Sequence, residues 1–232
     1  RKTKTVITRD SVRFYLDDTP SVDAGLGPAR KVYWERFIKP LPNQKANFDG
    51  ERHALSPTHP LYMDFDRSLV TGLWWTPPGQ VIEDGDHVYL VEGIFDAIAL
   101  HLSGVKVAAT MAAGFFPSLA VKPYLGKGIV WIWALDGDKA GREKMDKHRK
   151  RMEEMGELTT MALTGSSWLD WNDLYKRKRL DKPEFLEKCQ YRGMLAAAKT
   201  RERKAWVFFR ERKNIRHFVI EMNNALYSIQ VD

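Results

Sequence analysis

The chain has 232 residues, of which 44% are apolar and 29% are charged, a composition typical of a globular protein with one large domain or two small ones. No stretch approaches the ~20 apolar residues of a membrane span, and no signal-peptide pattern opens the chain. We therefore expect a cytoplasmic protein without a membrane partner. The single cysteine, Cys189, excludes an internal disulfide and a cysteine-rich zinc site.

The formal net charge of +7 is unevenly distributed. Basic residues gather in three segments, at residues 139–151, 176–179 and 201–213, and the last of these also contains Trp206, Phe208 and Phe209. Each segment alone is most simply a solvated helix face. Together they favour a polyanionic partner, because lysine and arginine gain free energy by releasing counterions from phosphates. We expect the aromatic residues among them either to pack in a core or to stack on unpaired bases.

Residues 1–79 lack a clean helical period and predict a small mixed α+β subdomain. Residues 31–38 predict a strand, and prolines interrupt much of the chain between this strand and residue 79. The segment from Arg52 to Tyr62 contains a Ser-Pro-x-x-Pro-Leu turn, which by composition alone is a proline-rich loop.

Residues 80–180 predict the core of the protein. A strand at 88–91 ends at Glu92, a helix covers 94–102, a second strand covers 105–108, and a buried strand at 128–135 ends at Asp136. Strands that alternate with helices imply right-handed crossovers and a parallel sheet. In such a sheet, ligands bind at the carboxyl ends of the strands.

Glu92, Asp136 and Asp138 should meet at that edge of the sheet. Carboxylates brought together repel one another unless a divalent cation neutralises them, and hard oxygen ligands suit Mg²⁺ or Mn²⁺. The alternative is a pair of structural loops with surface carboxylates. A charged helix at 141–155 and a strand at 159–163 follow, and then Asp170 and Asp173, which could cap a helix or contact a metal.

We expect residues 181–232 to be organised differently from the alternating strands and helices of residues 80–180. Residues 183–213 have a helix-forming composition, and residues 217–231 alternate around Asn223-Asn224 as in a β-hairpin. An isolated hairpin is marginally stable in water, so we expect this segment to lead into a further domain. The expected division is therefore 1–79, 80–180 and 181–232.

The motifs of the core resemble those of the TOPRIM domain of DNA primases. The residues on which this resemblance rests are Glu92-Gly93-x-x-Asp96 at one strand end and Asp136-x-Asp138-x-Ala140-Gly141 at another. The segment Asp170-Trp171-Asn172-Asp173-Leu174 is similar to the closing element of phage-type and mitochondrial-type helicase-primases. Asn172 stands where bacterial primases have a carboxylate. The segment at 52–62 resembles the one upstream of the TOPRIM core in bacterial primases.

The resemblance implies a role for each residue that matches the family. Asp136 and Asp138 would coordinate Mg²⁺ or Mn²⁺, and Glu92 would ligate metal or act as general base. Asp96 would be a second ligand or would hold the first ligands in place, and Asp170 maps onto the third acidic cluster. Gly93 would let the backbone approach phosphates, and the expected nucleotide or nucleic-acid contacts are Arg52, Lys139, Arg142, Lys176, Arg177, Lys178 and Arg179.

The function that this resemblance implies is primer synthesis: polymerisation of ribonucleoside triphosphates on a single-stranded DNA template, with a replicative helicase in cis or in trans. A TOPRIM nuclease would use the same carboxylates to direct water at a phosphodiester. A third alternative is a nucleic-acid-binding module without catalysis. The sequence from Val91 to Leu100, Val-Glu-Gly-x-Phe-Asp-Ala-Ile-Ala-Leu, favours the primase.

Overall fold

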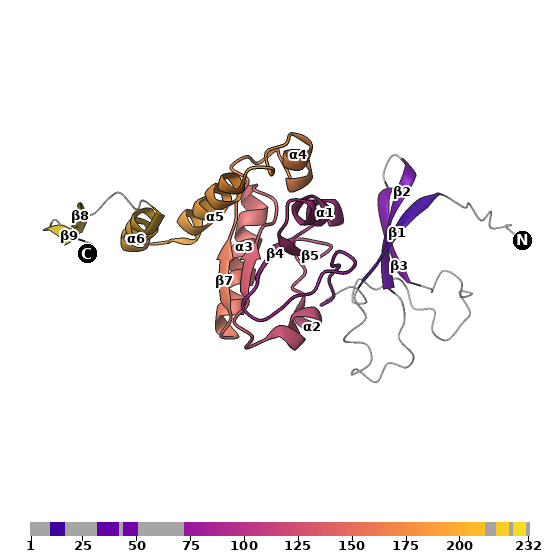
Figure 1. The fold of residues 1–232 in the computed structure, drawn as a ribbon, viewed down its shortest axis with the longest axis horizontal. Coiled ribbons are helices and arrows are strands. Elements are labelled where there is room, and N and C mark those ends of the chain that lie inside the picture. The colour runs from indigo at the N-terminus through magenta and orange to yellow at the C-terminus, as the bar shows by residue number, and fades with distance from the viewer. Residues whose placement is uncertain are drawn as a thin grey trace, which may run out of the picture.

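A computed structural model describes residues 10–16, 32–41, 44–50, 72–211, 217–222 and 225–230 (Figure 1). Within these ranges, no helix has the length and apolar character needed to span a lipid bilayer.

The centre of the molecule is a four-stranded sheet in the order β5-β4-β6-β7. All three strand pairs are parallel. The strands are β4 (His87–Val91), β5 (Lys106–Ala109), β6 (Val130–Trp133) and β7 (Leu158–Met161). Helices connect them: α1 (Ile94–Leu102) follows β4, α2 (Ser118–Val121) with a 3₁₀ turn, η3 (Lys122–Tyr124), lies between β5 and β6, and α3 (Lys139–Glu154) joins β6 to β7. The parallel sheet predicted from the sequence is confirmed.

Both faces of this sheet are buried, which explains the continuous apolar runs in its strands. In β4, Tyr89 and Val91 pack into one core with α1, and Val88 and Leu90 pack into a second core on the other face. The second core contains Trp131 and two residues of α3, Met145 and Met152. Helices therefore cover the sheet on both sides, as a parallel sheet requires.

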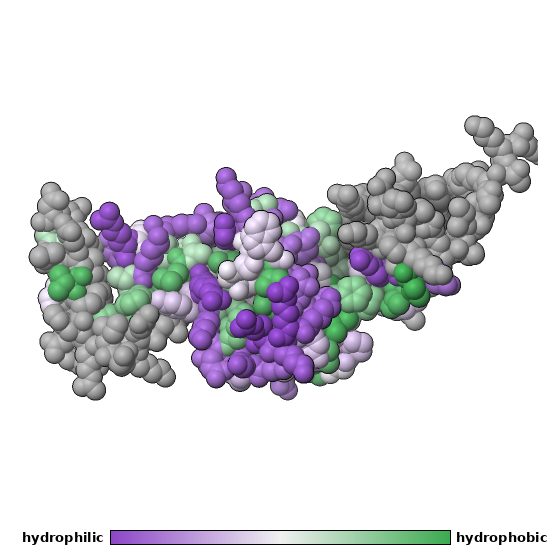
Figure 2. Space-filling view, turned by 90° about the horizontal axis from the view of Figure 1, so that it is seen from above, coloured by the Kyte–Doolittle hydropathy of each residue, from purple (hydrophilic) through white to green (hydrophobic). Residues whose placement is uncertain are grey.

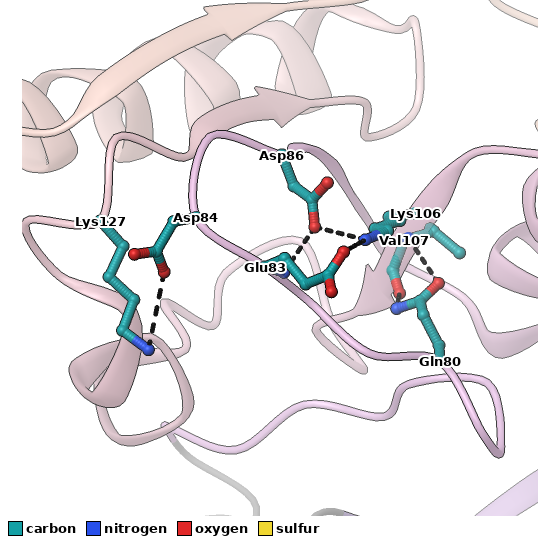
Figure 3. Close-up of polar contacts among 7 residues, drawn as sticks. All are labelled: Gln80, Glu83, Asp84, Asp86, Lys106, Val107 and Lys127. Carbon is teal, nitrogen blue, oxygen red and sulfur yellow. Dashed lines mark hydrogen bonds and ion pairs between the residues drawn. The ribbon is translucent and has the colours of Figure 1, made fainter.

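The amino-terminal edge of the sheet is held by ion pairs (Figure 3). Lys106 at the start of β5 donates to Asp86 at 2.5 Å and to Glu83 at 3.4 Å. Burial acts to raise the pKa of Asp86, but the hydrogen bonds from Lys106 and from the Glu83 backbone outweigh it, so the pKa lies below its usual value. These contacts tie the loop before β4 to β5, at the edge opposite the predicted site.

The N-terminal strands form a separate antiparallel sheet in the order β1-β2-β3. These strands are β1 (Ser11–Tyr15), β2 (Val32–Leu41) and β3 (Gln44–Gly50), so the strand predicted at 31–38 is confirmed. Phe14 of β1 contacts Trp75 and Phe95 of the core edge to face, each with ring centroids 5.9 Å apart. In the described part of residues 1–79 the regular elements are these strands, and the proline-rich loop at 52–62 lies outside the described residues.

The C-terminal segment contains two long helices, α5 (Pro183–Ala197) and α6 (Arg201–Glu211), and the hairpin of β8 (His217–Met222) and β9 (Ala225–Gln230). The predicted hairpin is confirmed. Helix α5 packs on β7. Beside it, the Leu163 amide donates to the Cys189 carbonyl at 2.9 Å, and Gln190 donates to the Tyr89 hydroxyl of β4 at 2.7 Å. Helix α5 is thus continuous with the core, and the boundary at residue 180 stays a prediction. Figure 1 shows α6 and the hairpin at the end of the molecule away from β1–β3.

Candidate active site

Strands β4 and β6 are neighbours in the sheet, and this adjacency creates the site. Leu90 is in register with Trp133, so both strands end at the same edge. Glu92 directly follows β4, and Asp136 lies three residues beyond β6. The chain order separates these carboxylates by 44 positions, but the parallel pairing brings them to one edge.

The turn after β6 leads directly into α3. Asp138 is the N-cap of α3, and its Oδ1 accepts a hydrogen bond from the Gly141 amide at 2.6 Å. A Cβ atom at Gly141 would collide with the carbonyl oxygen of Asp136. A side chain at this position would therefore push the turn away from the first turn of α3. The pattern Asp-x-Asp-x-Ala-Gly thus has a packing reason as well as a chemical one.

Asp96 lies in the first turn of α1, and it connects that helix to α4 (Trp171–Lys176). Its Oδ1 accepts from the backbone amide of Asn172 at 3.0 Å. Its Oδ2 would be 2.9 Å from a Cβ atom at Gly93. Gly93 therefore gives room to a carboxylate of the protein itself, whereas a close approach of phosphates to Gly93 stays a prediction.

Asp170 caps α4, with its Oδ1 accepting from the Asp173 amide at 2.6 Å. The neighbouring Trp171 is buried, and its Nε1 donates to the Ala134 carbonyl at 2.7 Å. This bond fixes the start of α4 against the chain that leaves β6. Of the two roles considered for Asp170, capping is confirmed, and the same position places it close enough to influence the charge on Asp96 and Asp136.

The electrostatics show that these carboxylates form one cluster. Burial raises the pKa of Asp96 to about 7, and the charges of Asp170 and Asp136 contribute to the rise. The pKa of Glu92 is raised first by burial and then by Asp136 and Asp138. Burial, Asp138 and Asp170 raise the pKa of Asp136. Mutual repulsion of this kind makes the edge of the sheet favourable for a cation.

The donor set fits a hard divalent cation, although no three His, Cys, Asp or Glu side chains of the described residues already converge as a metal cage. Magnesium is commonly held by one or two carboxylates together with water and substrate phosphates, without a complete protein cage. An open group of carboxylates that repel one another matches that mode of binding.

Two contributors to the site were not predicted from the sequence. The backbone amide of Ala113 donates to Glu92, and the charge of Lys144 acts on the same carboxyl; both lower its pKa, less than burial and Asp136 raise it. Ala113 lies in the loop after β5, where Met111 has a φ of 69°, in the left-handed region. Loops that follow parallel strands are the expected place for such contacts, but a backbone donor leaves no residue-type signal.

The buried His148 of α3 supports this loop. Its Nε2 lies 2.8 Å from the Ala113 carbonyl, and its ring stacks on Trp133 with centroids 4.7 Å apart. A carbonyl only accepts, so Nε2 is the protonated nitrogen. Burial lowers the pKa of His148, and this agrees with a neutral ring.

The predicted basic contacts are placed in different ways. Lys139 and Arg142 are exposed on the first turn of α3, and Arg142 donates to the Gly137 carbonyl at 3.1 Å. The run from Lys176 to Arg179 is exposed at the far end of α4 from Asp170. Arg52 lies outside the described residues. Nucleotide or nucleic-acid binding by any of them stays a prediction.

Comparison with known proteins identifies the core. Residues 89–175 match the protein family described as Toprim-like. This segment is a Toprim-like domain. It begins in β4 and ends in α4, so it contains all five carboxylates of the site. The predicted fold class, a TOPRIM domain with a parallel sheet flanked by helices, is confirmed.

The chain is also similar to solved primase structures. One is the RNA polymerase domain of Mycobacterium tuberculosis primase DnaG, with 20% identity, a TM-score of 0.47, and coverage of 70% of this chain and 50% of that chain. Another is a DNA primase domain from Pseudomonas aeruginosa, with 18% identity, a TM-score of 0.49, and coverage of 74% and 48%. The zinc-binding and RNA polymerase domains of Aquifex aeolicus primase have 16% identity, a TM-score of 0.43, and coverage of 89% and 53%. The chain thus spans about half the length of these structures. No curated protein matched.

Proposed function

We propose that this protein is a DNA primase that synthesises short RNA primers on single-stranded DNA. The observation that carries the proposal is the gathering of Glu92, Asp96, Asp136, Asp138 and Asp170 at the carboxyl edge of the sheet in the Toprim-like domain. The sequence motif from Val91 to Leu100 favours primer synthesis over phosphodiester hydrolysis. A template, ribonucleoside triphosphates, a helicase in cis or in trans and a cytoplasmic location belong to the same proposal.

The reaction forms one bond and breaks another at phosphorus. The 3′-hydroxyl oxygen of the primer attacks the α-phosphorus of a nucleoside triphosphate, and pyrophosphate leaves. A bound Mg²⁺ or Mn²⁺ supplies charge neutralisation at the attacking and leaving oxygens. Asp136 and Asp138 would hold the metal, with Asp170 beside them, and Asp96 of α1 would be a second ligand or would hold the first ligands in place. Lys139 and Arg142 would face the triphosphate charge.

Glu92 is the candidate general base that accepts the proton of the attacking hydroxyl. Its raised pKa makes the carboxylate a better base than an exposed glutamate, since proton transfer is efficient when the catalytic pKa lies near the working pH. The hydrogen bond from the Ala113 amide lowers the pKa of the same carboxyl, less than burial and Asp136 raise it. The Glu92 carboxylate would accept the proton of the attacking hydroxyl.

One assay separates the proposed activity from its alternatives. The protein is incubated with Mg²⁺, labelled ribonucleotides and mixed single-stranded templates, and the products are resolved by size. Short oligoribonucleotides would support primer synthesis, and shortened templates would indicate a nuclease. The absence of both products would indicate a nucleic-acid-binding module without catalysis. Asp136→Asn should abolish the product. Asp86→Asn, the same change at the opposite edge of the sheet, is the matched control and should retain it.

A further inference from the structure

Helix α6 forms one wall of a large groove on the far side of the molecule from the acidic cluster. The groove has a volume of about 900 Å³ and lies between α6, α5 and the strands β6 and β7. His87 and Val130, at the amino ends of β4 and β6, line its floor. Because the carboxylates lie at the carboxyl ends of the same strands, this groove is separate from the candidate active site.

The aromatic residues of the third basic segment, residues 201–213, differ in how exposed they are in the structure. Phe209 is 9% exposed, whereas Trp206 is 59% exposed and lines the groove. Arg203 and Arg210 line the groove from the same helix, three positions before and four positions after Trp206, so all three lie on one face. Figure 2 shows hydrophilic side chains beside hydrophobic ones next to the grey C-terminal residues, where Figure 1 places α6.

Trp206 is held in place rather than loosely exposed. The Arg210 guanidinium lies over its ring, 4.9 Å from the centroid. Arg210 also donates to the sulfur of Met194 at 2.6 Å, which ties the guanidinium to α5. An indole fixed by an arginine and still more than half exposed presents a flat apolar surface beside a positive charge.

The chemistry of the groove matches a strand of nucleotides. Every base has a flat π-face that stacks on an aromatic ring, and every linkage carries a phosphate that attracts arginine. Arg149 of α3 lines the groove as well; it is 8% exposed, pairs with Asp146 and Glu153, and its buried Nε lacks a hydrogen-bond partner among the described residues. Glu187 is the acidic lining residue, so basic groups predominate.

We propose that this α6 groove binds single-stranded nucleic acid, with Trp206 stacking on a base and Arg203 and Arg210 contacting phosphates. The proposal rests on the proposed function in so far as the strand would be the template. The groove would hold that strand away from the reacting centre, so it should contribute to affinity and not to chemistry.

Binding is measured by fluorescence anisotropy of a labelled oligothymidylate, without nucleotides, in EDTA and over a range of salt concentrations. Trp206→Ala should weaken binding about tenfold, in the range for losing one base–aromatic stack, and Trp206→Phe should restore most of it. Arg203→Glu should flatten the dependence of affinity on salt, by a slope of about 0.7 for each lost phosphate contact. Lys204→Glu is the matched control: it makes the same change of charge one position along, on a residue outside the groove lining, and should have the smaller effect.

The outcomes separate the groove from the active site. Parent-like binding by Trp206→Ala, or equal losses for Arg203→Glu and Lys204→Glu, would overturn the groove proposal. So would a change in molecular mass by light scattering on Trp206→Ala, which would make the groove a protein interface. If primer synthesis fails in the parent while the variants bind as expected, the proposed function falls and the groove stands. If the parent synthesises primers and Trp206→Ala binds the oligonucleotide as the parent does, the groove proposal falls and the proposed function stands.

Discussion

Replacing Asp96 by Asn should stabilise the metal-free protein, and more so as the pH rises. Asp96 has its pKa raised to about 7 from a usual value of 3.8 by burial and by Asp170 and Asp136. A carboxyl group whose pKa is higher in the folded protein costs no stability below about pH 4. The cost then grows as the pH rises towards 7. Asn removes that charge and can still accept from the Asn172 amide.

The magnitude depends on the size of the pKa change. A change of one pKa unit corresponds to about 1.4 kcal/mol, so a rise from 3.8 to about 7 corresponds to about 4 kcal/mol above pH 7. About 1.6 kcal/mol of this is already present at pH 5. Relaxation of the protein and water penetration into an open site reduce this free-energy cost. We therefore expect the stability gained by Asp96→Asn to increase by about 2 kcal/mol between pH 5 and pH 8.

Urea denaturation at pH 5 and pH 8 in EDTA measures this difference. Asp86→Asn is the control, because the pKa of Asp86 is lowered by its hydrogen bonds from Lys106 and the Glu83 backbone (Figure 3). Its contribution is complete above its usual pKa, so the loss on substitution should be the same at both pH values. A gain for Asp96→Asn that does not change between pH 5 and pH 8 would refute the idea that its carboxylate is crowded and desolvated.

Three further predictions concern the site and its surroundings. Glu92→Gln should lower primer formation by a factor on the order of 10² and retain metal-dependent triphosphate binding in an equilibrium titration; a parallel loss of both would make Glu92 a primary metal ligand. Gly141→Ala should lower the free energy of unfolding by about 1 to 3 kcal/mol, because its Cβ collides with the Asp136 carbonyl, and a parent-like denaturation midpoint would contradict this packing. Reversing the charges of residues 176–179 should weaken single-stranded DNA binding and flatten its salt dependence; an unchanged slope would assign that run to the solvated surface.

The parallel sheet and its acidic edge could be predicted because their signals are local. A strand buried on both faces is a continuous apolar run, as in β4 and β6, and each run stops at an acidic residue. Once such strands alternate with helices, the helices act as crossover connections, and strands joined in this way are parallel. Glu92 and Asp136 then share one edge whatever the loops do. The helix that starts after Asp138 was also visible locally, since aspartate is a favoured N-cap.

Other features depended on contacts between segments far apart in the chain. The position of Asp96 under the start of α4 depends on a hydrogen bond to Asn172, 76 positions away, and burial there is what moves its pKa towards neutrality. The Ala113 amide reaches Glu92 only because β5 pairs with β4. Likewise, helical periodicity could not say whether Trp206 or Phe209 faces the core. The tertiary structure made that choice, leaving Phe209 9% exposed and Trp206 59% exposed, because burial of one face of a helix is decided by the segments it meets.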